Sequence, residues 1–305
     1  MQKNGKGGEI MPDYTHCELC PRRCGVDRTK GELGFCRMPA GARVARAAPH
    51  YWEEPVISGS FGSGAVFFSG CTLRCSFCQN SEISHEGFGK QVTPEKLREI
   101  FLRLCDEGVQ NINLVTPTHF LPDILPALTP KLPVPVVYNC GGYERAETLK
   151  MLEGKVDIYL PDMKYSDAAL AARLSGAGDY VEAAQAAIGE MFRQVGKPVI
   201  EDGVMKKGVL VRHLLLPGQV QNTLGVLDWL SSAFRPGDVL FSLMSQYTPL
   251  GRSKDTPPFD RRVTEEEYAA AQSWMELCGI REGFLQDFSA ASKDYVPEFN
   301  LEGVE

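Results

Sequence analysis

Short apolar segments alternate with longer amphipathic segments from residue 64 onward. The apolar segments are rich in β-branched and aromatic residues, as expected of strands buried on both faces. The amphipathic segments between them are typical of helices. This alternation indicates parallel βα units, so we expect an α/β fold with six principal strands. The six are residues 64–70, 111–116, 135–140, 156–162, 209–218 and 238–244.

The clearest helix start is at Thr93, whose side chain can cap a helix that has Pro94 in its first turn and Gly108 after its end. Residues 121–130 contain internal prolines, which predict a short or broken helix. Further helices are expected at 179–196 and 263–279, a turn at 203–208 (GVMKKG), and disorder at 1–12.

Composition and charge narrow the class of protein. The chain has 305 residues, of which 43% are hydrophobic, enough for a large core. Its formal net charge of -7 opposes binding to nucleic acid or to an anionic membrane surface. It contains no apolar segment of the roughly 18 residues that a membrane span needs, and its first residues lack the apolar part of a signal peptide. We therefore expect a cytoplasmic protein with no nucleic-acid and no membrane partner.

Ten cysteines in a cytoplasmic chain point to metal binding, because the cytosol keeps thiols reduced. Cys71, Cys75 and Cys78 directly follow the first predicted strand. Three thiolates on one loop can hold three irons of a 4Fe-4S cluster and leave the fourth iron open. A structural zinc site is the alternative, for which His85 is the nearest fourth ligand.

A second cysteine group precedes the predicted barrel, in the pattern C-x2-C-x3-C-x11-C. Four thiolates suit zinc and a second 4Fe-4S cluster equally well. Arginines make this region basic, which fits either docking of an acidic electron donor or a solvated face. The cysteines are Cys17, Cys20, Cys24 and Cys36, and the arginines are Arg22, Arg23, Arg37, Arg43 and Arg46.

The spacing C-x3-C-x2-C, with Phe77 before the last cysteine, resembles the signature of the radical SAM superfamily. The resemblance extends over nearly all of residues 50–250 and is closest to proteins related to the pyruvate formate-lyase activating enzyme. It implies a partial (β/α)6 barrel of the TIM type, here with an N-terminal cysteine-rich extension. It also implies an oxidoreductase that binds S-adenosylmethionine at the open iron and cleaves it reductively to a 5'-deoxyadenosyl radical for hydrogen abstraction. The electron would come from a donor such as flavodoxin or ferredoxin.

The same resemblance implies cofactor-binding residues at the strand ends. Asp162 and Lys164 match an Asp-x-Lys pair beside S-adenosylmethionine, with a plain surface ion pair as the alternative. Asn139 takes the place of the usual acidic residue after the third strand, followed by Cys140. The remaining cofactor-binding candidates are Phe77, Thr116, Arg212, Gln246 and Tyr247.

The segment after the second strand departs from the family pattern. Many members have Gly-Gly-Glu there, whereas this chain has LVTPTHF. Thr116, Thr118 and His119 offer polar groups in its place, and His119 could serve the substrate or simply cap the loop. His213 alternates with Arg212 to the other side of its strand, which predicts a packing role as readily as a chemical one.

We expect three regions: a cysteine-rich metal-binding segment at 1–60, the partial barrel at 61–250, and a C-terminal helix and tail at 251–305 that pack on the barrel. Three functions stay open. The first is an enzyme that abstracts hydrogen from a glycine of a partner enzyme. The second is an enzyme that modifies a peptide or small metabolite by the same radical, and the third is a non-catalytic metal-binding module. The tail residues expected to pack on the barrel or line a substrate pocket are Phe288, Tyr295 and Phe299.

Overall fold

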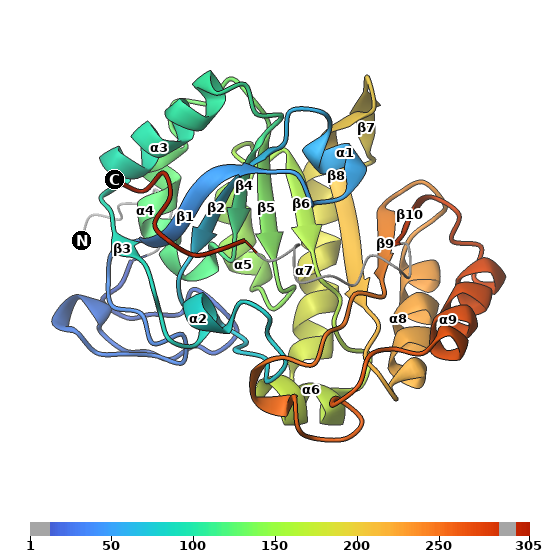
Figure 1. Cartoon of the computed structure of the whole chain (residues 1–305). Coiled ribbons are helices and arrows are strands. Elements are labelled where there is room, and N and C mark those ends of the chain that lie inside the picture. The colour runs from blue at the N-terminus through green and yellow to red at the C-terminus, as the bar shows by residue number, and fades with distance from the viewer. Residues whose placement is uncertain (1–12, 287–296) are drawn as a thin grey trace, which may run out of the picture.

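The computed structural model describes residues 13–286 and 297–305. Within this part of the chain ten strands form one open sheet, in the order β10-β9-β8-β6-β5-β4-β2-β1-β3 with β7 paired to β8 (Figure 1). The strands are β1 (Arg43–His50), β2 (Ser63–Phe68), β3 (Lys90–Gln91), β4 (Ile112–Val115), β5 (Val136–Cys140), β6 (Ile158–Pro161), β7 (Val199–Glu201), β8 (Val204–Leu214), β9 (Leu240–Met244) and β10 (Gly283–Leu285).

The sheet is mostly parallel. From β2 through β4, β5, β6, β8 and β9 to β10, every neighbouring pair runs in the same direction. Only β1, β3 and β7 pair antiparallel. The expected α/β fold with six parallel strands is therefore confirmed, and β10 adds a seventh parallel strand.

The longer helices, α3, α7 and α8, connect these strands and lie on the outer face of the curved sheet (Figure 1). Leu97, Ile100, Phe101 and Leu104 form the buried stripe of α3. Parallel strands need such crossover connections, and the carboxyl ends of all these strands therefore lie at the same edge of the sheet. The helices are α1 (Pro55–Ser58), α2 (Ser81–Ser84), α3 (Pro94–Asp106), α4 (Leu121–Ala127), α5 (Ala146–Leu149), α6 (Ala168–Ser175), α7 (Tyr180–Val195), α8 (Val220–Ala233) and α9 (Glu265–Leu277).

The helix start at Thr93, the short helix within 121–130 and the helix expected at 263–279 are confirmed. The Thr93 side chain caps α3 by accepting a hydrogen bond from the Lys96 backbone N–H. Helix α4 is short and contains Pro126, as its prolines predict. Thr264 and Glu267 form a reciprocal capping box at the start of α9.

The predicted turn at 203–208 is wrong in its extent. The chain turns at Asp202 and Gly203, both with positive φ, and Val204 already begins β8. The segment therefore closes a hairpin between β7 and β8. Lys206 and Lys207 make it look like a turn, but they are strand residues, because this part of β8 extends past the body of the sheet to pair with β7.

The two faces of the parallel strands pack against different partners. Val136 and Tyr138 of β5 belong to the main core shared with the surrounding helices. The alternate residue Val137 belongs to a smaller cluster with Val56 and Ile57 of α1. The cluster is completed by Ile158, Leu160, Met205, Leu210 and Leu240, so α1 fills one end of the barrel interior.

The C-terminal residues 297–305 lie beside β1. Leu301 N–H donates to the Ala45 carbonyl, and Glu302 accepts an ion pair from Arg46 at 2.9 Å. Phe299 packs edge-on against Phe67 at 5.5 Å. Phe288, Tyr295 and residues 1–12 lie outside the described residues. No helix in the described ranges is both long enough and apolar enough to cross a membrane.

Candidate functional site

The three-cysteine loop follows β2 at the carboxyl edge of the parallel strands. Gly70 precedes it with a φ of 78°, and a Cβ there would lie 2.9 Å from the Cys36 carbonyl oxygen. Hydrogen bonds hold the far side of the loop: Ser76 N–H donates to the Leu174 carbonyl, and Arg252 N–H donates to the Ser76 carbonyl. The loop is thus fixed between the N-terminal segment, α6 and the segment after β9.

Cys71, Cys75 and Cys78 line one cavity of about 220 Å³. Hydrogen-bond donors point at each sulfur: Leu73 N–H at Cys71, Ser175 Oγ at Cys75 and Ser84 Oγ at Cys78, at 3.4, 3.0 and 3.3 Å. Such donors stabilise thiolate charge and tune iron–sulfur clusters. The cysteine set and its surroundings therefore fit the 4Fe-4S cluster that the spacing predicts.

Burial raises the pKa of the Cys71 thiol to about 12 and also raises that of Cys78. Neighbouring cysteine charges act in the same direction. A bound metal supplies the positive charge that holds such thiols as thiolates. In the described ranges no three His, Cys, Asp or Glu side chains are arranged to hold one metal ion, so the metals at both cysteine groups stay predictions.

Charged side chains at the ends of β6 and β8 line the same cavity. Lys164 Nζ lies 2.5 Å from Asp162 Oδ2, and Arg212 Nε lies 3.0 Å from Asp162 Oδ1. All three side chains are largely buried. Burial opposes ionisation of Asp162, yet Lys164 and Arg212 together hold its pKa below the usual value. Asp162 and Lys164 are therefore not the surface ion pair that the sequence left open.

Two residues shape the turns that carry this cluster. Gly142 follows β5 with a φ of 79°, and a Cβ there would lie 2.1 Å from the Asp162 carbonyl oxygen. The Tyr180 hydroxyl accepts from the Lys164 N–H and lies 2.8 Å from the Asp162 carbonyl. The Gly-Gly pair after β5 thus permits the close approach of the two strand ends.

The structure brings the other predicted cofactor residues to this cavity as well. Phe77, Thr116, Asn139, Cys140, Gln246 and Tyr247 all contribute to its lining. Asn139 Oδ1 accepts from Arg212 Nη2 at 2.7 Å. The Tyr247 hydroxyl donates to the Phe259 carbonyl, so this tyrosine offers its ring, 6.2 Å from that of Phe77, rather than its hydroxyl.

His119 and His213 lie outside the cavity lining. His119 Nε2 is 2.7 Å from the Ser69 carbonyl, and burial lowers the pKa of its ring to about 3. His213 lies between Met163 and Thr223 on the helix side of β8. Both are neutral packing residues at ordinary pH.

The N-terminal cysteine group packs against the three-cysteine loop and the end of β4. Arg22 donates to the carbonyls of Thr72 and Ser175. Arg28 is fully buried and donates to the carbonyls of Met38, Pro39 and His119. Cys17, Cys20 and Cys36 are buried, and Cys24 is exposed. Arg22 and Arg28 thus hold the segment on the barrel, and Arg22 is not on a solvated face.

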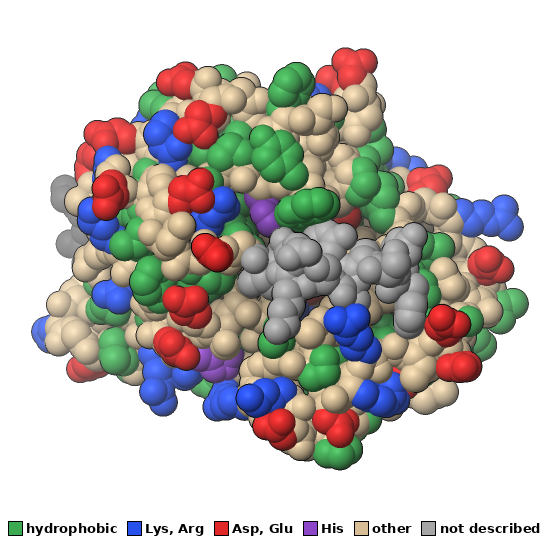
Figure 2. Space-filling model, in the orientation of Figure 1, with side chains coloured by type: hydrophobic (Ala, Val, Ile, Leu, Met, Phe, Trp, Pro, Cys, Tyr) green, Lys and Arg blue, Asp and Glu red, His purple; other side chains and the backbone are tan. Residues whose placement is uncertain are grey.

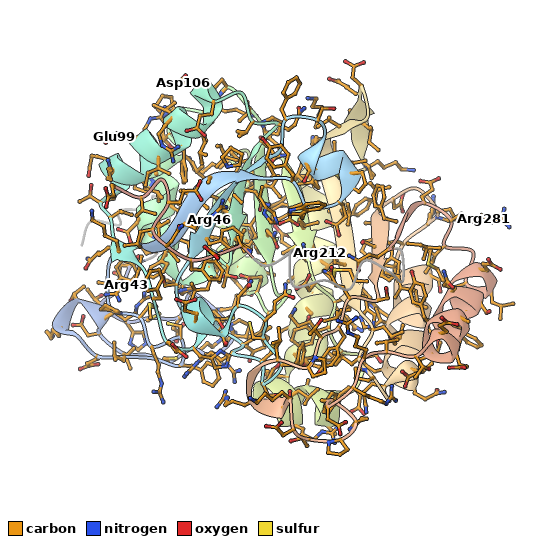
Figure 3. The ribbon with its side chains drawn as sticks, viewed as in Figure 1. Arg43, Arg46, Glu99, Asp106, Arg212 and Arg281 are labelled. Atoms are coloured by element: carbon orange, nitrogen blue, oxygen red, sulfur yellow. The ribbon has the colours of Figure 1, made fainter. Side chains whose placement is uncertain are left out.

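Sequence reasoning missed Glu53, Glu54 and Arg28. Glu53 Oε2 accepts from Arg212 Nη1 at 2.9 Å, and Glu53 Oε1 accepts from Asn139 and Asn113 at 3.1 Å. Figure 3 shows Arg212 near the centre of the molecule, whereas the labelled Glu99 and Arg281 lie at its periphery. The signal in the sequence was two adjacent carboxylates in the apolar and aromatic segment HYWEEPVI, where charged residues are uncommon unless they are paired.

Fold and site together define an open α/β barrel protein with a cysteine-lined cofactor cavity. The model of the radical SAM superfamily matches residues 65–230. The uncharacterized protein MJ0674 of Methanocaldococcus jannaschii is 30% identical over 269 residues, which cover 85% of this chain and 73% of that protein. This chain belongs to the radical SAM superfamily, a family of enzymes whose cofactors are a 4Fe-4S cluster and S-adenosylmethionine.

Solved structures match this chain at lower identity. SuiB of Streptococcus suis, in a crystal structure bound to S-adenosylmethionine, is 11% identical with a TM-score of 0.49, and the match covers 73% of this chain and 50% of SuiB. A domain of the pyruvate-formate lyase-activating enzyme from Bacteroides vulgatus is 14% identical with a TM-score of 0.37, over 64% of this chain and 91% of that domain. This chain spans about half the length of SuiB.

Proposed function

We propose that the chain cleaves S-adenosylmethionine reductively and uses the resulting 5'-deoxyadenosyl radical to abstract hydrogen from a substrate. One observation carries this proposal: three cysteines share a single cavity with the charged residues at the ends of β6 and β8. When bound, the cluster supplies the electron for the cleavage. Cys71, Cys75 and Cys78 would hold it.

The chain's own residues match the groups of S-adenosylmethionine. Asp162 and Asn139 offer oxygen acceptors for the amino group, while Lys164 and Arg212 offer cationic donors for the carboxylate and hydroxyls. Burial lowers the proton affinity of Lys164, but Asp162 outweighs it and raises the pKa of Lys164, so the amine stays charged. The rings of Phe77 and Tyr247 provide apolar surface for the adenine. Thr116 and Gln246 complete the proposed set.

An acidic electron donor such as flavodoxin or ferredoxin would meet a basic surface near the cluster. Burial is the main cause that lowers the pKa of Arg74, and the nearby charges of Arg37 and Arg252 lower it further. Arg74 itself lies in the cysteine loop. This concentration of positive charge favours a negatively charged partner. Cys17, Cys20, Cys24 and Cys36, packed on the same loop, would hold a second 4Fe-4S cluster or zinc.

The test is anaerobic reconstitution with iron and sulfide, followed by reductant and S-adenosylmethionine and chromatography for 5'-deoxyadenosine. We expect slow formation without substrate, and loss of the product and of the cofactor-responsive paramagnetic signal when Cys71, Cys75 and Cys78 are replaced by alanine. Alanine at Cys17 and Cys20 should remove one metal centre and keep the other. A reduced, fully loaded protein that forms no 5'-deoxyadenosine would favour the non-catalytic metal-binding module.

Activation of a glycyl-radical enzyme is the finer form of this proposal, and modification of a peptide or small metabolite is its alternative. Both need a route from solvent to the cofactor cavity. The open edge of the sheet, between β1–β2 and β9–β10, supports such a route. Incubation of the reduced enzyme with a candidate partner, followed by detection of a glycyl radical by electron paramagnetic resonance, separates the two.

A further inference from the structure

A second cavity of about 570 Å³ adjoins the cofactor cavity. Asn139, Arg212 and Gln246 line both. Its other walls come from the two edges of the open sheet: His50 and Phe67 on the β1–β2 side, and Ser242 and Phe284 on the β9–β10 side. This second cavity is therefore the lateral opening of the barrel, and it meets the cofactor cavity at Arg212.

Each nitrogen of Arg212 makes one hydrogen bond within the protein. Nε donates to Asp162, Nη1 to Glu53 and Nη2 to Asn139. Glu53 in turn has a hydrogen bond on each oxygen. Arg212, Asp162, Glu53 and Asn139 thus form one continuous hydrogen-bond network at the back of the second cavity.

Glu54 lines the second cavity and remains outside this network. Its side chain is only 8% exposed, and its Oε2 accepts no hydrogen bond from any residue in the described ranges. The nearest cation among the described residues is Arg212, whose Nη1 is 3.9 Å away. His50 does not compensate, because burial and then Arg46 lower its pKa to about 4 and leave its ring neutral. Burial raises the pKa of Glu54, while Arg212 and a hydrogen bond from Ser242 act against this rise. A buried carboxylate oxygen without a donor is unfavourable unless a ligand supplies one, and a cationic ligand would also favour the ionised form.

The mouth of the cavity is aromatic and apolar. Tyr51 and Trp52 line it and are 56% and 59% exposed, and Leu285 on the opposite edge is 50% exposed. Hydrophobic side chains also gather above the centre of this face, near α1 (Figure 2). Aromatic faces attract organic cations and pack against alkyl chains.

We infer that the second cavity takes a substrate with a cationic nitrogen group, ammonium or guanidinium, for which Glu54 Oε2 is the acceptor and Tyr51 and Trp52 pack around the alkyl stem. The term substrate rests on the proposed radical function, whereas binding of the cation does not. A free alkylamine metabolite and a lysine or arginine side chain of a peptide share this chemistry.

Calorimetric titration of the anaerobic, reconstituted protein with S-adenosylmethionine and no reductant tests the inference without any turnover. The probes are n-butylammonium, n-butylguanidinium and the uncharged isostere n-butylurea. We expect at least one cation to bind about tenfold more tightly than n-butylurea and to quench Trp52 fluorescence. Glu54→Gln should abolish the difference, since a charge-assisted hydrogen bond contributes on the order of a tenfold change in affinity.

Glu201→Gln, the same change at an exposed glutamate on β7, should leave cation binding unchanged. Equal binding of all three probes to the wild-type protein would overturn the inference, even if Glu54→Gln failed to fold. So would unchanged cation affinity in a folded Glu54→Gln variant. A protein that binds the cations but forms no 5'-deoxyadenosine after reduction would refute the proposed function and leave the cation site standing.

The source of the cation follows from two more probes. Tighter binding of acetyl-Gly-Arg-Gly-amide than of agmatine supports a peptide substrate, and the reverse order supports a small metabolite. Both results uphold the cation site. If the protein binds neither probe, the site does not accept guanidinium groups and the inference is contradicted for them.

Discussion

Arg212 connects the two cavities, because one guanidinium bonds to a carboxylate from β6, a carboxylate before α1 and an amide from β5. The carboxylates pack around one arginine that is itself buried. Arg212 is thus a shared partner of both carboxylates, and Lys164 also stabilises Asp162. We therefore expect a substitution of Arg212 to affect folding as well as the proposed cofactor binding.

Arg212→Met should consequently destabilise the protein strongly. Removing one partner of a buried ion pair leaves uncompensated charges and costs about 3–5 kcal/mol. Urea unfolding followed by circular dichroism measures the loss. Arg193→Met breaks half-exposed ion pairs to Glu153 and Glu190 and should cost about 1 kcal/mol or less. Comparable losses in the two variants would contradict the central role of Arg212.

His213 predicts a pH dependence. Its Nδ1 lies 2.6 Å from the Met163 carbonyl and its Nε2 lies 2.9 Å from the Thr223 hydroxyl, which fits a neutral ring that donates at Nδ1 and accepts at Nε2. Burial lowers its pKa to about 4. Between this value and about 6.5 the unfolded chain binds the extra proton, so the stability due to this site is lost as the pH falls through that window.

His213→Asn should therefore narrow the difference in Tm between about pH 7.5 and about pH 5, by an amount equivalent to about 2 kcal/mol. Scanning calorimetry at the two pH values measures this. His16→Asn, at an exposed histidine, serves as the control and should leave the difference as it is in the wild type. If His213→Asn keeps the wild-type difference, the ring does not change its protonation on unfolding.

At the scale of elements, α1 is only four residues long, yet it closes one end of the barrel. Ile57 is fully buried among inward-facing residues of β5, β6 and β8. The helix also places Glu53 and Glu54, which directly precede it, beneath Arg212. Packing of α1 thus fixes the acidic wall of the second cavity.

Ile57→Ala should lower the free energy of unfolding by about 2–5 kcal/mol, because it leaves a cavity in a tightly packed interior. Ile200→Ala removes the same atoms from the exposed strand β7, where Ile200 is 46% exposed, and should cost far less. Denaturant titration compares the two. Equal costs would mean that α1 does not form part of the barrel core.

At the scale of the whole molecule, the cofactor cavity draws residues from the cysteine loop and from β4, β5, β6, β8 and β9. A ligand that contacts so many elements should stabilise the complete fold. By mass action, a ligand at about a hundred times its Kd contributes about 2.7 kcal/mol.

S-adenosylmethionine should thus raise the Tm of the cluster-loaded protein by several degrees. The Cys71, Cys75 and Cys78 alanine variant should show a much smaller rise, because it lacks the cluster that anchors the ligand. Anaerobic thermal unfolding with and without S-adenosylmethionine measures the rise in Tm of each protein. An identical rise in both proteins would place the ligand elsewhere.

The sequence by itself determined the strand order along the chain, the cap of α3 and the cysteine spacing that indicates the family. These features depend on local spacing: apolar periodicity, a capping threonine before proline, and three thiols on one loop. For the same reason the sequence assigned His213 and Arg212 to opposite faces of β8.

Only the tertiary structure decided which charged groups meet. Glu53 and Arg212 are 159 residues apart, and only the closure of the sheet around α1 brings them to 2.9 Å. The hairpin of β7 and β8 and the parallel addition of β10 likewise depend on partner strands rather than on local pattern. Glu54 is informative for the same reason, because whether a carboxylate has a hydrogen-bond donor depends on every element packed around it.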